Sequence, residues 1–340
     1  MLKHQVVVGT HSDSIHLVEF DPAVPSLVVL HSLCLREQPS TVTLSPSIPG
    51  LFYANSWTDD RLYAIQLSEE KGFEVKSETA AGGGGPTHFV VNGDALLAVN
   101  YRGGSIVRHP LTDDGLFSSP SPAPNRIFSF PYRHATPPHS RQESSHPHQL
   151  IRHGENWLIP DLGTDTLWEM RWSGGNEGKW ELVGEHGVAP QSGPRHGVKH
   201  PSEPLLYLVN EVGASASVHN LPSAVSTSPV SVAPSTSAPS PPSPPLPSLL
   251  PALSTYTVLP PRLQNVPRID GYDRIPATIL FLSPLPNSPP DSPSTLFVSN
   301  RNSPAHLSPD GDSFVQYTVP PADPTKLVDP VFHLGAGHHS

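Results

Sequence analysis

The chain has 340 residues, of which 36% are hydrophobic and 15% charged, and its formal net charge is −10. This length suits one large all-β domain with a sizeable core, and the negative balance excludes a general nucleic-acid binder, because such proteins carry basic patches. Cys34 is the sole cysteine, which excludes an intramolecular disulfide and a thiolate metal cluster.

The N-terminal stretch MLKHQVVVGTHSDS has no charged segment followed by a long apolar one, so no signal peptide is predicted. No run approaches the roughly 20 apolar residues of a membrane span. We therefore expect a cytoplasmic protein without a membrane partner. The single cysteine fits a reducing compartment.

One pattern recurs along the chain. A Pro-containing lead-in precedes an alternating strand, a turn, a second apolar strand with a polar last residue, a Gly/Ser/Asp turn and a third strand. The copies cover residues 39–67, 86–111, 146–172, 193–221 and 276–319, and residues 4–20 fit the second and third strands of one more copy. Runs such as LLAVN and LLYLVN are short and bounded by turn residues, which favours strands over helices.

A polar residue closes the second strand of each copy. These residues are Thr10, Asn55, Asn100, Asp161, Asn210 and Asn300, and the first three lie 45 residues apart. A period of about 40–50 residues with several short strands is typical of a β-propeller. The sequence therefore predicts an all-β chain that forms a single β-propeller domain over residues 1–340. After the sixth copy, FHLGAG at residues 332–337 resembles the lead-in of another copy, which predicts an incomplete last blade.

Residues 221–255 form a low-complexity segment rich in Ser and Pro. Frequent proline removes backbone donors, and few large apolar groups are present to offset the ordering entropy. We expect a disordered insertion within one blade. The proline spacing also fits a ligand of an SH3-type partner, although a tolerated surface insertion is the favoured interpretation.

Several motifs, in this order along the chain, resemble the seven-bladed propeller lactonase family. They are HPHQ and IPDLGTD, then GPRH and LYLVNE, then LFVSNR, with VVVGT and GGGGPTHFVV before them. The family includes the fungal 3-carboxy-cis,cis-muconate lactonising enzyme and the bacterial-type 6-phosphogluconolactonase. The resemblance covers nearly the whole chain outside the Ser/Pro-rich segment. It implies a seven-bladed ring and cofactor-free opening or closing of a lactone ring on a small anionic substrate.

The resemblance also implies catalytic positions at His148, Arg195, Glu211 and Arg301. Arginine stays charged and binds carboxylate or phosphate in a bidentate manner, which suits Arg195 and Arg301 to an anionic lactone or its open acid. His148 and Glu211 are the candidates for proton transfer, with acid and base unassigned. His196, next to Arg195, is a candidate supporting residue for substrate binding.

Other interpretations remain open at this point. Hydrolysis of 6-phosphogluconolactone and cycloisomerisation of 3-carboxymuconate both fit, and so does a non-catalytic propeller that serves as a protein-binding platform or is a truncated pseudo-enzyme. His146 and His148 form an H-x-H pattern, but no further ligand follows at a recognisable spacing, so no metal is expected. Gly82 to Gly85 precede a strand and not a helix, which indicates an inter-blade turn and not a phosphate loop.

Overall fold

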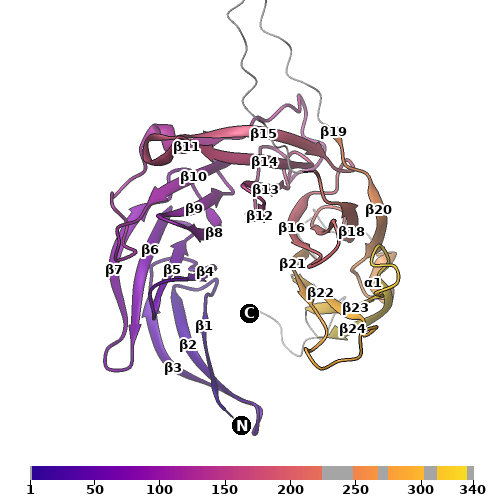
Figure 1. The fold of residues 1–340 in the computed structure, drawn as a ribbon, viewed down its shortest axis with the longest axis horizontal. Helices are drawn as coiled ribbons and strands as arrows, with labels where there is room; N and C mark the ends of the chain where they lie inside the picture. Colours follow the sequence, from indigo (N-terminus) through magenta and orange to yellow (C-terminus); the bar gives the residue numbers. More distant parts are fainter. Residues whose placement is uncertain (1, 224–247, 267–274, 302–311, 335–340) are drawn as a thin grey trace, which may run out of the picture. The chain divides into compact units, whose positions relative to one another are not determined.

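The computed structural model describes residues 2–223, 248–266, 275–301 and 312–334 (Figure 1). Six sheets form within these residues, and neighbouring strands are consecutive in the chain except for β15 with β19 and β18 with β20. Sheet 1 contains β1 (His4–Val8), β2 (Ser14–Asp21) and β3 (Ser26–Cys34). Sheet 2 contains β4 (Val42–Leu44), β5 (Leu51–Ser56), β6 (Arg61–Ser68) and β7 (Gly72–Ala80). Sheet 3 contains β8 (Pro86–Asn92), β9 (Ala95–Asn100), β10 (Ser105–Pro110) and β11 (Ile127–Ser129).

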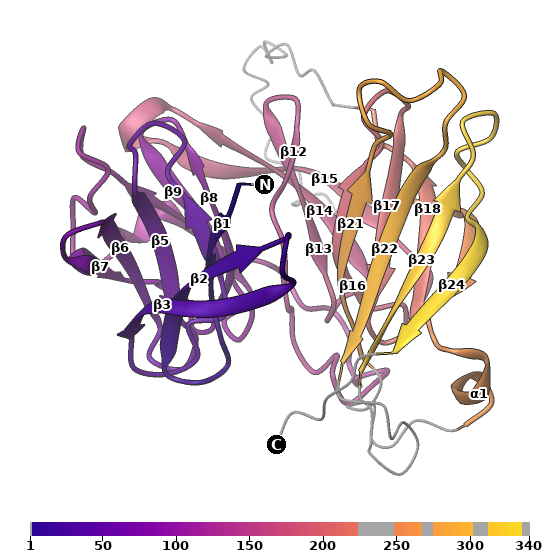
Figure 2. The ribbon, with the colours of Figure 1, turned by 90° about the horizontal axis from the view of Figure 1, so that it is seen from below.

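The remaining three sheets follow the same order. Sheet 4 contains β12 (Ile151–His153), β13 (Asn156–Asp161), β14 (Thr166–Ser173), β15 (Lys179–Gly187) and, beside β15, β19 (Ser248–Leu249). Sheet 5 contains β16 (Pro194–Lys199), β17 (Leu205–Asn210), β18 (Ser215–Asn220) and β20 (Ala252–Thr257). Sheet 6 contains β21 (Ile275–Leu282), β22 (Ser294–Arg301), β23 (Ser313–Val319) and β24 (Val328–Leu334) (Figure 2). Helical structure in the described residues comprises α1 (Pro261–Gln264), η1 (Pro124–Arg126) and η2 (Gly175–Glu177).

These six sheets are the six copies counted in the sequence, so the all-β prediction is confirmed.

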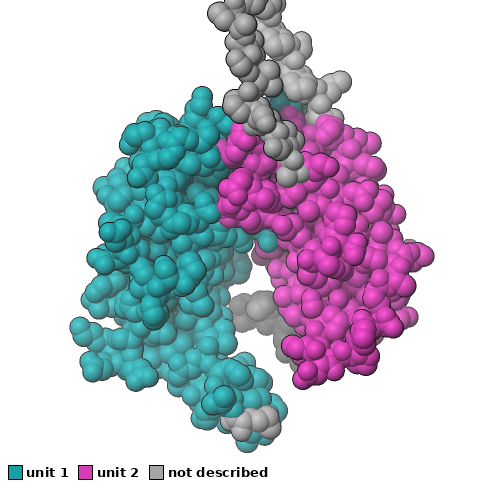
Figure 3. Space-filling model, viewed as in Figure 1, with its two compact units in different colours: residues 1–150, 159–164, 172–181 teal, residues 151–158, 165–171, 182–340 magenta. Residues whose placement is uncertain are grey.

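The described residues divide into two compact units, shown in different colours in Figure 3. Unit 1 comprises residues 1–150, 159–164 and 172–181, and unit 2 comprises residues 151–158, 165–171 and 182–340. Sheets 1 to 3 belong to unit 1 and sheets 5 and 6 to unit 2, while sheet 4 contributes residues to both.

In sheets 2 to 5 the second strand is the most buried element. Every residue of β5, β9, β13 and β17 is buried. A strand that is covered on both faces needs apolar residues at successive positions and not only at alternate ones. This requirement explains the continuous runs ALLAV and LLYLV, which the sequence analysis recognised as strands.

Five of the six predicted strand-closing polar residues are buried, namely Asn55, Asn100, Asp161, Asn210 and Asn300, whereas Thr10 is partly exposed and lies beyond the end of β1. The side-chain amide of Asn100 donates to the carbonyl oxygen of Ala81 at 3.2 Å, and that of Asn300 donates to the carbonyl oxygen of Val258 at 2.7 Å. Such bonds compensate for the burial of a polar group at a strand end. In sheet 2 the residue that corresponds to Asn100 is Ser56. Ser56 pairs with the first residue of the third strand of sheet 2, and Asn100 pairs with the first residue of the third strand of sheet 3. Asn55 therefore lies one residue before the corresponding position.

Two of the loops between sheets are each held together by an aspartate. Asp60 has a positive φ of 56° and accepts a hydrogen bond from the backbone N–H of Gly84 at 2.8 Å. Asp165, with a φ of 52°, accepts bonds at 2.7 Å from the backbone N–H groups of Gln191 and Gly193. Gly82 to Gly85 thus form a turn between β7 and β8, which confirms the interpretation of the glycine run. Burial raises the pKa of Asp60, while the backbone donors act in the opposite direction.

Two predictions about the second half of the chain need correction. The residues FHL of FHLGAG belong to β24, the fourth strand of sheet 6, and do not begin another copy; residues 335–340 lie outside the described residues. The predicted disordered segment 221–255 ends in ordered structure, because β19 and most of β20 fall within it. Residues 224–247 lie outside the described residues. β19 joins β15 in parallel, and the Ser248 hydroxyl lies 3.1 Å from Nδ1 of His186.

Candidate active site

Two positions in the repeated sheet hold all four predicted catalytic residues. The first position follows a proline that is paired with the closing residue of the second strand. The prolines of this kind are Pro86, Pro147, Pro194 and Pro276, which pair with Asn100, Asp161, Asn210 and Asn300. The residues that follow them are Thr87, His148, Arg195 and Ala277. His148 and Arg195 therefore occupy the same position in sheets 4 and 5.

The second position directly follows the closing residue. It is occupied by Tyr101, Leu162, Glu211 and Arg301 in sheets 3 to 6. Because the proline pairs with the closing residue, the two positions of one sheet are adjacent in space. This geometry explains how Arg195 and Glu211, which stand at two strand boundaries of sheet 5, come together.

Arg195 and Glu211 form a buried ion pair in sheet 5. Nη1 of Arg195 donates to Oε2 of Glu211 at 2.7 Å, and the two side chains are 9% and 0% exposed. The pairing register of β16 with β17 shifts between Pro194 and His196, which places a β-bulge at Arg195. A bulge redirects the side chain of the extra residue, and here it brings the guanidinium to the carboxylate.

Arg301 approaches the same carboxylate from sheet 6. Its Nη2 lies 4.0 Å from Oε2 of Glu211, and its side chain is 31% exposed. Two guanidinium groups thus share one carboxylate, which leaves the group of three side chains with a net positive charge. Arg301 is the more accessible of the two cations. The structure therefore brings together three of the four predicted catalytic residues.

His196 points to a different neighbour. Its Nδ1 lies 3.2 Å from the hydroxyl oxygen of Thr278 on β21, and the residue is partly exposed. This contact links the first strands of sheets 5 and 6. A role of His196 in substrate binding stays a prediction.

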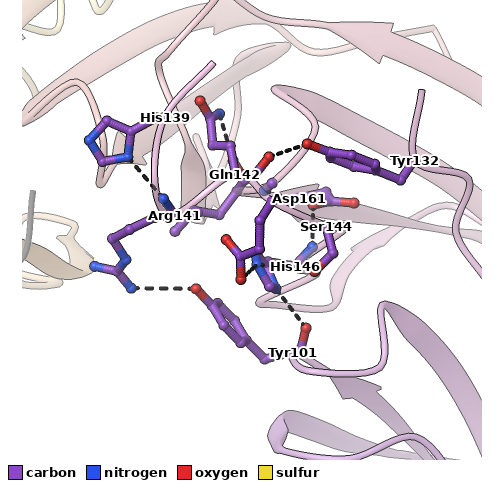
Figure 4. Close-up of polar contacts among 11 residues, drawn as sticks. Tyr101, Tyr132, His139, Arg141, Gln142, Ser144, His146 and Asp161 are labelled. Atoms are coloured by element: carbon purple, nitrogen blue, oxygen red, sulfur yellow. Dashed lines mark hydrogen bonds and ion pairs between the residues drawn. The ribbon is translucent and has the colours of Figure 1, made fainter. Parts of the chain in front are cut away.

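His146, the first histidine of the HPH motif, is held by its surroundings in unit 1 (Figure 4). Its Nδ1 lies 2.9 Å from the carbonyl oxygen of Tyr101, and its ring stacks on the Tyr101 ring with centroids 4.1 Å apart. Its backbone N–H donates to Oδ1 of Asp161 at 2.6 Å, and the hydroxyl of Ser145 donates to the other carboxylate oxygen at 2.5 Å. Asp161 also accepts the N–H of Gly163 at 2.9 Å. These contacts fix the segment that leads to His148.

His148 is 7% exposed and belongs to unit 1, and its ring makes a T-shaped contact with Tyr101 at a centroid distance of 5.6 Å. Its backbone N–H donates to the carbonyl oxygen of Pro160 at 3.0 Å. The HPH motif thus combines a structural histidine with a second one at the position that Arg195 occupies in sheet 5. Arg195, Glu211 and Arg301 belong to unit 2, so we describe His148 with its own neighbours.

Sequence reasoning missed Tyr101, which contacts both histidines and stands at the position of Glu211 and Arg301. The available signal was its place directly after the closing residue Asn100.

Among the described residues, no group of three or more His, Cys, Asp or Glu side chains is arranged to hold a metal ion. The helices of the described part are all too short or too polar to span a membrane.

The repeated sheets and the group of two arginines around one glutamate define a β-propeller with a cationic polar site. A family model described as "Lactonase, 7-bladed beta-propeller" matches residues 5–239, which is more than half of the chain. The chain therefore belongs to the seven-bladed β-propeller lactonase family, as its motifs predicted. Its described residues form six sheets, so seven blades are not observed in this chain.

Solved structures with the same fold cover nearly the whole chain. A "putative 6-phosphogluconolactonase" of Bacteroides fragilis has a TM-score of 0.71 at 21% identity, covering 99% of this chain and 83% of that one. The periplasmic gluconolactonase of Pseudomonas aeruginosa has a TM-score of 0.68 at 19% identity, covering 97% of this chain and 83% of that one. A curated protein of Arthroderma benhamiae, "Probable 6-phosphogluconolactonase", is 24% identical over 208 residues, or 59% of this chain. The match spans about half, 51%, of that relative.

Proposed function

We propose that this protein hydrolyses a phosphorylated sugar lactone of the 6-phosphogluconolactone type. The observation that carries the proposal is the shared carboxylate of Glu211, which lies 2.7 Å from Arg195 and 4.0 Å from Arg301. One carboxylate neutralises only one of the two guanidinium charges. The two guanidinium groups provide the charged donors that bind a phosphate or carboxylate group.

The two arginines differ in the role that their surroundings allow. Arg195 is 9% exposed and is bonded to Glu211, so it holds the carboxylate in a fixed orientation. Arg301, with 31% of its side chain exposed, is accessible to a substrate phosphate. We assign anion binding mainly to Arg301, and orientation of Glu211 to Arg195. Hydrogen bonds between a guanidinium and a phosphate are roughly twice as strong as neutral ones.

Lactone hydrolysis requires water to attack the carbonyl carbon, after which the bond from that carbon to the ring oxygen breaks. The attacking water loses one proton and the released ring oxygen gains one. A nearby guanidinium would stabilise the negative charge that develops on the carbonyl oxygen. His148 and Glu211 are the proposed proton-transfer groups, and the assignment of base and acid between them is left to experiment.

The family and the names of its relatives support the lactonase assignment. Because the match spans about half of the curated relative, the activity of that relative is carried over here only as a proposal. Cycloisomerisation of 3-carboxy-cis,cis-muconate is the competing reaction, since its substrate also presents carboxylates to two arginines. A non-catalytic propeller is the competing role, and it predicts turnover of neither substrate.

The decisive experiment measures turnover of both substrates by the purified full chain. We expect hydrolysis of 6-phosphogluconolactone, with KM raised about 10–100-fold by Arg301→Ala, because a charged hydrogen bond contributes roughly 1.5–3 kcal/mol. The matched control is Arg152→Ala, which removes an exposed arginine of β12 whose partner Glu155 lies in the turn between β12 and β13. Unchanged kinetics in Arg301→Ala, or turnover of the muconate alone, would contradict the proposal.

A further inference from the structure

The connection between sheets 3 and 4 is longer than the connections before and after it. Residues 81–85 connect β7 to β8 and residues 188–193 connect β15 to β16, whereas residues 130–150 connect β11 to β12. Since a short connection is enough to join two sheets of this repeat, the extra length needs another explanation. Loops that are held on a rigid scaffold commonly carry functional residues. We call residues 130–146, which precede Pro147, the long connection.

Hydrogen bonds hold the long connection beside the end of β13 (Figure 4). Gln142 is 0% exposed, and its side-chain amide donates to the carbonyl oxygen of Leu162, directly after β13, at 2.9 Å. The carbonyl oxygen of Gln142 accepts the hydroxyl of Tyr132, and its N–H donates to the carbonyl oxygen of His139 at 2.9 Å. The N–H of Arg141 donates to Nδ1 of His139 at 3.2 Å. The backbone around Arg141 is therefore fixed.

The side chain of Arg141 extends from the long connection to Tyr101 (Figure 4). Its Nη2 lies 3.4 Å from the hydroxyl oxygen of Tyr101, and both residues are partly exposed. A guanidinium group can only donate, so the phenol oxygen is the acceptor of this bond and the phenol's own proton serves a separate one. A hydroxyl that accepts a hydrogen bond from a cation becomes a stronger donor, because linked hydrogen bonds polarise one another.

Tyr101 is itself held beside His148. Its N–H donates to the carbonyl oxygen of Gly85 at 2.8 Å, and its ring stacks on His146 and makes a T-shaped contact with His148. Tyr101, Arg141 and both histidines belong to unit 1, so these contacts lie within one compact unit. A ligand that reaches His148 therefore also lies beside Tyr101.

The ring contacts of Tyr101 do not account for its hydroxyl. A phenylalanine at this position would provide the same ring to stack on His146 and to contact His148. The hydroxyl instead lies at the guanidinium of Arg141, which the long connection holds in place. Tyr101 also occupies the position after the strand-closing residue, which holds Glu211 in sheet 5 and Arg301 in sheet 6. The hydroxyl and the guanidinium thus have a function other than packing.

We propose that Tyr101 is a further catalytic residue, whose hydroxyl donates a hydrogen bond to the carbonyl oxygen of the lactone in the transition state. Arg141 is a positioning residue, which orients that hydroxyl and strengthens it as a donor. These roles rest on the lactonase function proposed above, and they add to it a donor for the oxygen on which negative charge develops.

The hydroxyl of Tyr101 keeps its proton throughout the reaction. Water adds to the carbonyl carbon, and the π electron pair of the C=O bond moves to the carbonyl oxygen, which becomes negative and accepts the hydrogen bond of Tyr101. The C=O bond then re-forms while the bond from carbon to the ring oxygen breaks. The ring oxygen gains the proton that the water lost. A donor directed at such a developing charge contributes about 100–1000-fold to kcat.

The test measures hydrolysis of 6-phosphogluconolactone by the purified full chain and by three variants. Tyr101→Phe keeps the stacked ring and removes the hydroxyl alone. We expect its kcat to fall about 100-fold while KM changes by less than about threefold, because the lost bond forms only in the transition state. Arg141→Met is expected to lower kcat about tenfold, again with little change in KM. The double variant is expected to be no slower than Tyr101→Phe, because Arg141 acts through the hydroxyl that is already absent.

Two controls remove the same chemical groups elsewhere in the chain. Tyr53→Phe removes a buried hydroxyl that donates to the carbonyl oxygen of Gly115 at 2.7 Å, and Arg152→Met removes an exposed guanidinium on β12. Both controls are expected to retain the kcat of the wild type. The melting temperature of every variant separates loss of chemistry from loss of folding. Arg141→Met also tests the hydroxyl without any change to the stacked ring.

The possible outcomes separate these roles from the proposed function. Wild-type turnover with an unchanged kcat in Tyr101→Phe would overturn the role of Tyr101 and leave the lactonase assignment intact. Losses of kcat that multiply in the double variant would overturn the role of Arg141. An equal fall in kcat in Tyr53→Phe would trace the effect to stability and overturn both roles. Absence of wild-type turnover would overturn the lactonase assignment and these roles with it.

Discussion

The ion pair between Arg195 and Glu211 gives a sharp prediction for stability. Glu211→Gln keeps the shape of the side chain and an oxygen acceptor for Nη1 of Arg195, but it removes the negative charge. Arg195 is only 9% exposed, so its guanidinium would remain buried after the loss of the Glu211 charge. Removal of one partner of a buried pair costs about 3–5 kcal/mol. Because Arg301 at 4.0 Å also loses its counter-charge, we expect a loss of at least about 3 kcal/mol.

The assay is urea unfolding followed by both fluorescence and circular dichroism, with the free energy of unfolding extrapolated to water. Glu155→Gln is the control, because Glu155 is 90% exposed and lies 3.5 Å from an exposed Arg152; we expect a change below about 0.5 kcal/mol. The double variant Arg195→Met/Glu211→Gln removes both charges and should be more stable than Glu211→Gln alone. A loss of less than about 1 kcal/mol in Glu211→Gln would refute the view that the pair is buried and charged.

Three further predictions concern other parts of the fold. Burial lowers the pKa of His109, which is 2% exposed, from 6.5 to about 3, so the unfolded chain takes up a proton before the folded one does. The free energy of unfolding should therefore fall between about pH 6.5 and pH 3, by up to about 1.4 kcal/mol per pH unit from this residue, and His109→Phe should remove that contribution in acid titrations. Gly103→Ala should lower the melting temperature sharply, because a Cβ there would lie 1.6 Å from the carbonyl oxygen of Gly83; an unchanged melting temperature would contradict this close approach. Tyr53→Phe should cost about 1 kcal/mol in urea unfolding, since it removes a buried hydrogen bond of 2.7 Å to Gly115, and a neutral result would contradict the bond.

The sequence predicted the repeated sheets because the second strands of sheets 2 to 5 are buried on both faces. This burial produces continuous apolar runs with a polar residue at the end, a signal that survives in a single sequence. The signal is weaker where a strand is exposed: β24 contains VDPVFHL, whose last three residues were assigned to the lead-in of another copy. An apolar run locates the end of a strand only to within one residue. In sheet 2 the residue that corresponds to Asn100 is Ser56, and not the predicted Asn55.

The candidate site was predictable to the extent that it lies at strand ends. The positions of Arg195, Glu211 and Arg301 follow from the repeat, and the motifs supplied their residue types. The sharing of one carboxylate by two guanidinium groups was not predictable, because it depends on the β-bulge at Arg195 and on the approach of sheet 6. Tyr101 was missed because an aromatic residue after a strand resembles an ordinary turn residue.

The register explains how one repeated sheet supports several chemical roles. The position after the strand-closing residue holds tyrosine in sheet 3, leucine in sheet 4, glutamate in sheet 5 and arginine in sheet 6. The closing residue itself stays polar and buried in these sheets, because it bonds to neighbouring elements and determines the pairing of the strands. Substitution at the following position leaves those bonds of the closing residue intact, so its residue type can differ from sheet to sheet. The buried closing residues thus maintain the pairing of the strands, while the positions directly after them provide the chemistry, and Glu211 adds a buried ion pair of its own.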